Sequence, residues 1–532
     1  MSVAGGPVRL DRPRDRAELF PGENLAVCGP RSAIGDRLWT WQPAVRGPGS
    51  AVRPALDVAV DSAHHANGRP AIPADAAEER TISAEPALMY RTAVELARLV
   101  REREVSSVEV VAAHIRRIEA VNPTLNAVVR LETERALDAA RRADEALARA
   151  RHHDRAPTGS PHAIGPLHGV PFTVKDNIAT EGIVTTAGVA DRASAVPEHD
   201  ATVVARLRAA GGIVLAKTNL PPWGGGSETV NELFGRTNNP HDLERSVSGS
   251  SGGEAAIIAA GASPLGIGTD SGGSVRDPAH FCGLAAWKPT AGLVPTTGVI
   301  DEDGPIGPMV DPRTQVGVLA RSVGDLTLVG PILAGPDGLD AGVAPVGSAF
   351  DGADAADVDG LRVAVMTDNG VVAPSADTVA TVLAAADALD GLGVRVAAAR
   401  HPDGDHELTR EIWRSYDGEL SSRDLYGVLG RWDGYRTAML RWMGEWDGLI
   451  CPVYPTPAHL HGGLDRNGLS YTTPFSLTGW PCVVVRCGSS AEGLPIGVQV
   501  VAGPWRDGVA LRVAAALERA LGGFVAPPGV GA

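Results

Sequence analysis

The sequence predicts an α/β protein whose sheet is covered by helices on both faces. After residue 163, short apolar runs typical of buried strands alternate with helical segments. Hydrophobic residues make up 44% of the 532-residue chain, enough to bury a large core. No internal repeat is present, so a solenoid or an array of repeats is excluded.

Composition narrows the functional classes. The formal net charge is −15, which argues against a broad phosphate-binding surface, and no basic stripe with aromatic residues is present. We therefore expect no nucleic-acid partner. The five cysteines are odd in number and lack metal-ligand spacing, as expected of reduced thiols in a cytoplasmic protein. The first thirty residues lack a signal-peptide pattern and no apolar run approaches ~18 residues, so no membrane partner is expected.

Residues 1–85 differ in composition from the rest of the chain. They are rich in Gly, Pro, Ala, Arg and Asp, and show no sustained periodicity. This composition predicts a disordered N-terminal extension, with a loosely docked arm as the alternative. The catalytic domain is expected over 86–525, followed by a tail at 526–532. A chain starting near residue 86 is expected to fold and to keep its activity.

Two capping boxes open the organised part of the chain. Thr92 with Glu95, and Ser106 with Glu109, each match the pattern of a helix N-terminus. The second helix is expected to stop before Asn122-Pro123.

The remaining elements follow in order. Asp200 is expected to cap a helix that ends at Gly211. A long surface loop is expected over 334–360. The other expected helices are 131–150, 378–393 and 507–522, and the expected strands lie within 169–178, 213–218, 361–366, 482–488 and 496–503.

Two glycine-serine loops interrupt this pattern: "SGSSGG" at 248–253 and "GTDSGGSVRDPAHFCG" at 268–283. Both lie between buried segments, where a flexible linker is not expected. Glycine lets backbone N–H groups approach a ligand closely, and successive N–H groups form a concavity for negative charge. The charge is either a phosphate or the oxyanion formed when a nucleophile attacks a carbonyl. Neither nucleotide-binding glycine motif is present, and both loops carry serines.

A serine nucleophile needs a base. No G-x-S-x-G elbow surrounds these serines, although a histidine base remains an alternative. The candidates are His162, His168 and His199 in this half of the chain, and His280 near the second loop. Lys175 follows the apolar run "VPFTV" and becomes a base if burial lowers its pKa. The competing interpretation is a strand-end lysine that reaches solvent.

Taken together, "GVPFTVKDN", "SGSSGGE" and "GTDSGGSVRDPAHFCG…KPT" resemble the amidase signature family of serine hydrolases. Their order along the chain is that of the family. The resemblance covers roughly residues 86–525. Supporting matches are "AKTNLPPW", "LFGRTNNP", "LARSVGDL", "DGLICPVYPTPA", "PFSLTGWPCVVV" and "GLPIGVQVVAGP".

The resemblance implies a single large mixed β-sheet in an α/β/α sandwich. It also implies a Ser–cis-Ser–Lys triad of Ser274 as nucleophile, Ser250 as the middle serine with a cis peptide bond, and Lys175 as base. No metal or cofactor is implied. The oxyanion hole would consist of the N–H groups of Ser271, Gly272, Gly273 and Ser274. The supporting residues would be Ser251, Asp270 and Arg276, the last two either pairing to hold the loop or forming a mere surface salt bridge.

The implied reaction is hydrolysis of a small-molecule carboxylic amide through an acyl-enzyme, with esters and carbamates (urethanes) as further substrates. Relatives of this kind also make a homodimer one expectation. The alternative is the glutamine-amidohydrolase subunit of a tRNA-dependent amidotransferase, which would act with a partner. A non-catalytic relative is opposed by the intact Lys175, Ser250 and Ser274.

Substrate choice is expected to come from residues 221–235 and 405–450. Trp223, Gly224 and Gly225 are the candidate substrate-binding residues. Further tryptophans that either wall the pocket or belong to the core are Trp432, Trp442 and Trp446. Departures from the family pattern are Ser248, expected to be tolerated, and Asp277 and Trp287, which alter either the acyl pocket or the packing.

Overall fold

The computed structural model describes residues 88–150, 164–302, 304–307, 311–402, 406–416 and 418–528. All of these belong to one compact unit, 72–532. The extension expected at 1–85 therefore lies outside the described residues, as do His162 and most of the tail expected at 526–532. The domain boundaries stay predictions.

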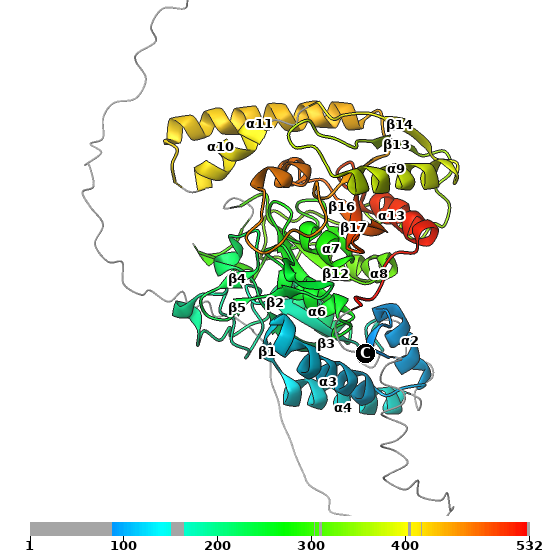
Figure 1. Cartoon of the computed structure of the whole chain (residues 1–532). Coiled ribbons are helices and arrows are strands. Elements are labelled where there is room, and N and C mark those ends of the chain that lie inside the picture. Colours follow the sequence, from blue (N-terminus) through cyan, green and yellow to red (C-terminus); the bar gives the residue numbers. More distant parts are fainter. Residues whose placement is uncertain are drawn as a thin grey trace, which may run out of the picture. The chain divides into compact units, whose positions relative to one another are not determined.

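One mixed sheet of eleven strands forms the centre of this unit (Figure 1). Strand β2 runs parallel to its neighbours β3 and β8, whereas β8 runs antiparallel to β12. In sheet order the strands are β1 (Val128–Leu131), β3 (Ile213–Thr218), β2 (Pro171–Lys175), β8 (Leu265–Asp270), β12 (Gln315–Ala320), β9 (Ala285–Lys288), β16 (Cys482–Ser489), β17 (Pro495–Ala502), β15 (Gly448–Pro452), β13 (Arg362–Val365) and β14 (Arg395–Ala398).

Helices cover both faces of the sheet. The evidence is that consecutive residues of a strand, which point to opposite faces, are buried in different apolar clusters. Val318 of β12 packs into one cluster and Leu319 into another. The predicted two-sided α/β class is therefore confirmed. The longer helices are α2 (Ala93–Glu102), α3 (Ser107–Leu125), α4 (Thr133–Ala150), α5 (Thr202–Ala209), α6 (Gly252–Ala259), α7 (Arg276–Cys282), α8 (Val323–Leu333), α9 (Ala376–Asp390), α10 (His406–Tyr416), α11 (Ser422–Met443), α12 (Thr473–Thr478) and α13 (Asp507–Leu521). None of the described helices is both long and apolar enough to span a membrane.

Both capping boxes are present at the starts of α2 and α3. Two helix boundaries differ from expectation. Helix α3 continues through Pro123 to Leu125, where the Asn122 side chain accepts hydrogen bonds from the N–H groups of residues 127 and 128 and closes the end. Asp200 does not cap α5, because its carboxylate accepts the N–H of Glu181 instead.

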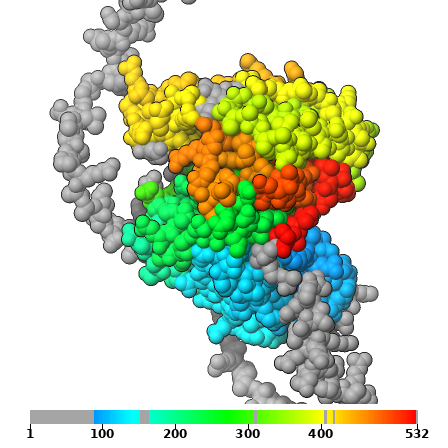
Figure 2. Space-filling view, viewed as in Figure 1, coloured from blue at the N-terminus to red at the C-terminus, as the bar shows by residue number. Residues whose placement is uncertain are grey.

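The pairing of β2 with β8 creates the setting for the site. The two strands are parallel, with Thr173 opposite Gly266 and Val174 opposite Ile267. Their carboxyl ends therefore meet at one edge of the sheet, and the glycine-serine loops precede α6 and α7 beside this edge. Helices α10 and α11 pack against α12, and their yellow and orange surfaces adjoin in Figure 2.

Candidate active site

Lys175 ends β2 and is fully buried, which excludes the interpretation as a lysine that reaches solvent. Its Nζ donates to Ser250 Oγ over 2.6 Å and to Thr269 Oγ1 over 2.8 Å. Burial lowers the pKa of Lys175 to about 7, although the carboxyl groups of Asp270 and Glu254 act in the opposite direction. A large fraction of this lysine is therefore neutral near neutral pH, as a base requires.

The loop that contains Ser250 connects the lysine to the second glycine-serine loop. The Gly249–Ser250 peptide bond is cis. The N–H of Ser251 donates to the carbonyl of Ser274 over 3.0 Å, and its Oγ donates to the carbonyl of Thr269 over 3.3 Å. The backbone thus holds the two loops against each other.

Ser274 is partly exposed and lines a cavity, as a nucleophile must. Its hydroxyl makes no hydrogen bond to another described residue, Ser250 included. The structure thus brings Lys175 and Ser250 into contact and places Ser274 on the adjoining loop. It does not close the relay between the two serine hydroxyls.

Asp270 and Arg276 form a buried pair, not a surface salt bridge. Arg276 Nη2 lies 2.8 Å from Asp270 Oδ1, Nε lies 2.9 Å from Oδ2, and both side chains are 0% exposed. Burial by itself would raise the pKa of Asp270, but the Arg276 guanidinium lowers it to about 2. Arg276 also donates to Thr472 and Gln499, so the pair ties the loop to distant segments.

The Asp270 carboxylate also occupies one amide expected in the oxyanion hole. Gly273 donates its N–H to Asp270 Oδ1 over 2.9 Å, so this amide is not free. Among the described residues, the N–H groups of Ser271, Gly272 and Ser274 have no such acceptor. Of the four amides expected to form an oxyanion hole, Gly273 therefore already has an acceptor.

The loop borders a cavity of about 880 Å³. Trp223, Gly224 and Gly225 line it, as the sequence indicated. Gly224 has a positive φ of 77°, a conformation that favours glycine, and a β-carbon there would lie in ordinary contact at 3.5 Å from Ser250 Oγ and 3.8 Å from Lys175 Nζ.

Trp413 of α10 forms a second wall that sequence reasoning missed. Its ring lies 3.1 Å from the position of a β-carbon on Gly272, so it covers the oxyanion loop. The Arg313 guanidinium stacks 4.2 Å from the ring centroid and pairs with Asp311. The sequence predicted this wall only through the broad range 405–450, which was expected to contribute to substrate choice.

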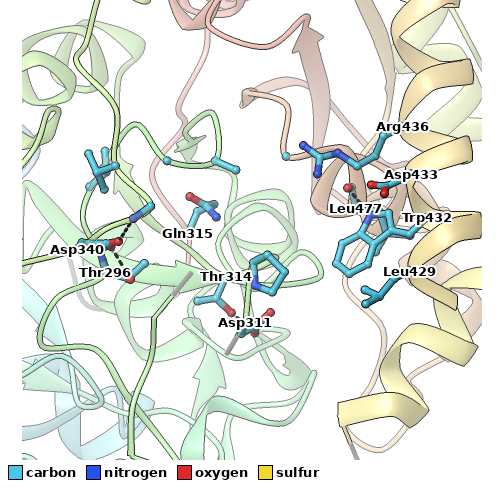
Figure 3. Close-up of a pocket in the computed structure, with 17 residues that line it drawn as sticks. Thr296, Asp311, Thr314, Gln315, Asp340, Leu429, Trp432, Asp433, Arg436 and Leu477 are labelled. Atoms are coloured by element: carbon cyan, nitrogen blue, oxygen red, sulfur yellow. Dashed lines mark hydrogen bonds between the residues drawn. The ribbon is translucent and has the colours of Figure 1, made fainter. Parts of the chain in front are cut away.

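A second cavity has a volume of about 370 Å³, and Figure 3 shows the residues that line it. Trp432 lines it, with its indole N–H donated to the carbonyl of Leu477 over 2.7 Å, and does not line the catalytic cavity. Asp311 and Thr314 belong to both walls. Thr314 is hydrogen-bonded to Asp311 and to the Ser271 hydroxyl, so this partition holds the oxyanion loop. Trp442 and Trp446 line neither cavity and pack in a core cluster.

The departures from the family pattern have separate structural settings. Ser248 adopts a positive φ of 62°, a conformation that glycine adopts more readily. Trp287 is a core residue whose Nε1 donates to Asp507 over 3.0 Å. Asp277 lines the catalytic cavity, and neither carboxyl oxygen has a hydrogen-bond partner among the described residues. Burial raises its pKa well above the ordinary value.

The histidine base, a metal site and the cysteines were the other features considered from the sequence. His280 Nδ1 accepts the N–H of Gly497 and Nε2 contacts the carbonyl of Thr456, so it faces no serine. Within the described residues no cluster of His, Cys, Asp and Glu could hold a metal ion. The described cysteines are free and buried: Cys282, Cys451, Cys482 and Cys487.

Comparison with known proteins identifies the family. The Amidase family model matches residues 109–429 and 428–511. An acylamidase of Rhodococcus erythropolis is 33% identical over 82% of this chain and 96% of its own length. A glutamyl-tRNA(Gln) amidotransferase subunit of Salinispora tropica is 34% identical over 82% of this chain and 98% of its own. The solved 6-aminohexanoate cyclic dimer hydrolase with substrate superposes with a TM-score of 0.71 at 30% identity, covering 83% of this chain and 100% of that one. The chain therefore belongs to the amidase signature family and is an amidase, a hydrolase of carbon–nitrogen bonds.

Proposed function

We propose that this chain hydrolyses carboxylic amides without a partner, through an acyl intermediate on Ser274. One observation carries the proposal: Lys175, buried and with its pKa lowered to about 7, lies 2.6 Å from Ser250 beside a cavity lined by Ser274. A buried neutral amine is a base that needs no histidine.

The mechanism follows from this arrangement. Lys175 accepts the proton of Ser250, and Ser250 accepts the proton of Ser274, once bound substrate brings the two hydroxyls together. Ser274 Oγ then attacks the carbonyl carbon, and the amides of Ser271, Gly272 and Ser274 stabilise the oxyanion. When the C–N bond breaks, the amine leaves with a proton returned along the same path. Water, deprotonated through the same relay, then cleaves the acyl ester and releases the acid.

The cavity favours a polar substrate of moderate size. Its volume of about 880 Å³ holds a drug-sized molecule, and its lining includes arginines and carboxylates such as Arg410, Arg414 and Glu302. Esters and carbamates present the same carbonyl to Ser274 and are proposed as additional substrates.

A second candidate is the amidotransferase subunit, because several relatives of that name are 30–34% identical to this chain over most of its length. Such a protein would release ammonia from glutamine only with partner subunits. Hydrolysis of amides by the purified chain alone separates the two functions.

The test is a rate panel on the purified chain. It compares short- and long-acyl nitroanilides with a matched aryl carbamate, using Ser274→Ala as the control. Turnover that Ser274→Ala abolishes supports the proposal. Glutamine hydrolysis that requires added partner subunits, without turnover of the panel, would favour the amidotransferase function.

A further inference from the structure

We propose that Glu254 is a positioning residue that carries no charge in the active enzyme. It fastens the helix that follows Ser250 to the strand that ends at Lys175. Its neutrality leaves this lysine free to act as a base. The inference rests on the proposed function, because it concerns the same lysine and serine.

The Glu254 side chain joins three elements. It lies in the first turn of α6, just after Ser250, and is 0% exposed. Oε1 accepts a hydrogen bond from Thr218 Oγ1, at the end of β3, over 2.8 Å. Oε2 is hydrogen-bonded to the hydroxyl of Thr173, which precedes Lys175 by two residues and so shares its side of β2. Movement of Glu254 would therefore change the distance between Lys175 and Ser250.

The neighbouring strand leaves room for this carboxyl group. A β-carbon at Gly266 of β8 would lie only 1.9 Å from Glu254 Oε2. Only glycine fits at this close approach of strand and helix. The third strand of the site is therefore also shaped around Glu254.

Burial outweighs the charged groups around Glu254 in setting its protonation. Lys175 faces it from β2 and Lys217 faces it from β3. Lys217 has its own carboxylate, Asp176, at 3.9 Å. Burial raises the pKa of Glu254 to about 8, although the two threonine hydrogen bonds and the two lysines act against this. Further along α6, Arg117 and Arg321 donate to the carbonyls of Ala260 and Ile258.

The threonine partners accommodate the protonated acid. A proton on Oε2 can be donated to Thr173 Oγ1, whose own proton can point to the carbonyl of Leu265 at 3.4 Å. Glutamine keeps a donor group (NH2) towards Thr173 and an acceptor (the carbonyl oxygen) towards Thr218, and it carries no charge. An ionised Glu254 would instead stabilise protonated Lys175 and remove the base.

The test measures how fast a fluorophosphonate probe labels Ser274 as a function of pH, with the full chain. This readout needs no substrate. The variants are Glu254→Gln, which keeps the hydrogen bonds, and Glu254→Met, which keeps only the volume. The control is Glu518→Gln, a half-buried glutamate of α13 that accepts the N–H of Val323 and lines neither cavity.

We expect Glu254→Gln to label within about twofold of wild type with an unchanged first midpoint. Glu254→Met should label about 100-fold more slowly at a temperature where circular dichroism shows it folded, because small misplacements of reacting groups cost that much. In wild type, the labelling rate should rise over a broadened pH range that extends above pH 8, since Glu254 and Lys175 then titrate as a coupled pair. In Glu254→Gln, the labelling rate should rise in a single step.

Three results would overturn the inference. A midpoint lowered by about one pH unit in Glu254→Gln would mean that Glu254 is ionised in the active enzyme. Labelling of Glu254→Met at the wild-type rate would remove the positioning role. If Glu254→Met does not fold, the pH profile of Glu254→Gln is the remaining test. A profile as broad as that of wild type would show that Glu254 and Lys175 do not titrate as a coupled pair. Absence of labelling in wild type would instead contradict the proposed function itself.

Discussion

Lys175 and Asp270 are both fully buried at the ends of adjacent strands, yet burial leaves them in opposite states. Asp270 has a guanidinium partner, so its pKa falls to about 2 against the effect of burial, and it stays charged. Lys175 donates only to neutral hydroxyls, so the effect of burial prevails and its pKa falls to about 7. The difference in partners suits Asp270 to anchor the loop and Lys175 to act as the proposed base.

We predict that the labelling rate of Ser274 rises about tenfold per pH unit below pH 7 and rises less steeply above it, because only neutral Lys175 accepts a proton and Glu254 titrates at a higher pH. Lys175→Arg should lose about 100- to 10,000-fold, since arginine stays protonated. Labelling by the fluorophosphonate probe across this pH range provides the measurement. A Lys175→Arg variant with the wild-type rate would contradict the role of the lysine.

Some residues of the candidate site could be predicted from the sequence and others could not. Lys175, Ser250 and Ser274 stand in motifs whose glycines and serines have no other explanation. Thr269 and Glu254 look like ordinary strand and helix residues, and their importance depends on which strands are neighbours. Gly273 was expected to offer its amide, but the distance to the Asp270 carboxylate depends on the fold of the loop.

Helix α10 and the glycine-rich segment of Trp223 to Gly226 both line the cavity that Ser274 borders. Trp413 of this helix contacts Gly272 and stacks under Arg313. Arg313 pairs with Asp311, which belongs to the partition shared with the second cavity. The size of the acyl group accepted should therefore depend on this helix more than on the strands.

We predict that Trp413→Leu raises kcat/KM for a bulky acyl nitroanilide relative to a short one by about tenfold, because a smaller side chain deepens the cavity beside Gly272. The matched control is Trp442→Leu in α11, whose ring packs against Trp446 and lines neither cavity. An equal change of the ratio in both variants would show that the effect is one of stability, not of the wall.

The strands and helices were more predictable than their boundaries. Apolar runs such as 213–218 coincide with β3, because buried strands tolerate few polar residues. The helix was expected to stop before Asn122-Pro123, but it continues to Leu125, where the Asn122 side chain closes its end. A helix end of this kind depends on contacts between a side chain and the segment that follows, here the start of β1. The residues of the helix alone do not predict such contacts.

At the scale of the whole molecule, the described fold begins with tightly packed residues. Leu88 is buried, and Tyr90 contacts Arg117 and stacks on Phe524 near the other end of the chain. Helix α2 packs on α8, and the carboxylate of Asp325 accepts the N–H of Val94. The boundary of the folded enzyme should therefore lie before Leu88 and not after it.

We predict that a chain of residues 86–532 folds and keeps its activity, because it retains Leu88, the capping box at Thr92 and every contact of α2. A chain of residues 104–532 is the control. It lacks Leu96 and Val100, and burying each such side chain is worth about 1.5–3 kcal/mol, a large share of a net stability of about 5–15 kcal/mol. Thermal unfolding and the nitroanilide assay compare both with the full chain. Loss of folding or activity in 86–532 would show that residues before 86 belong to the enzyme.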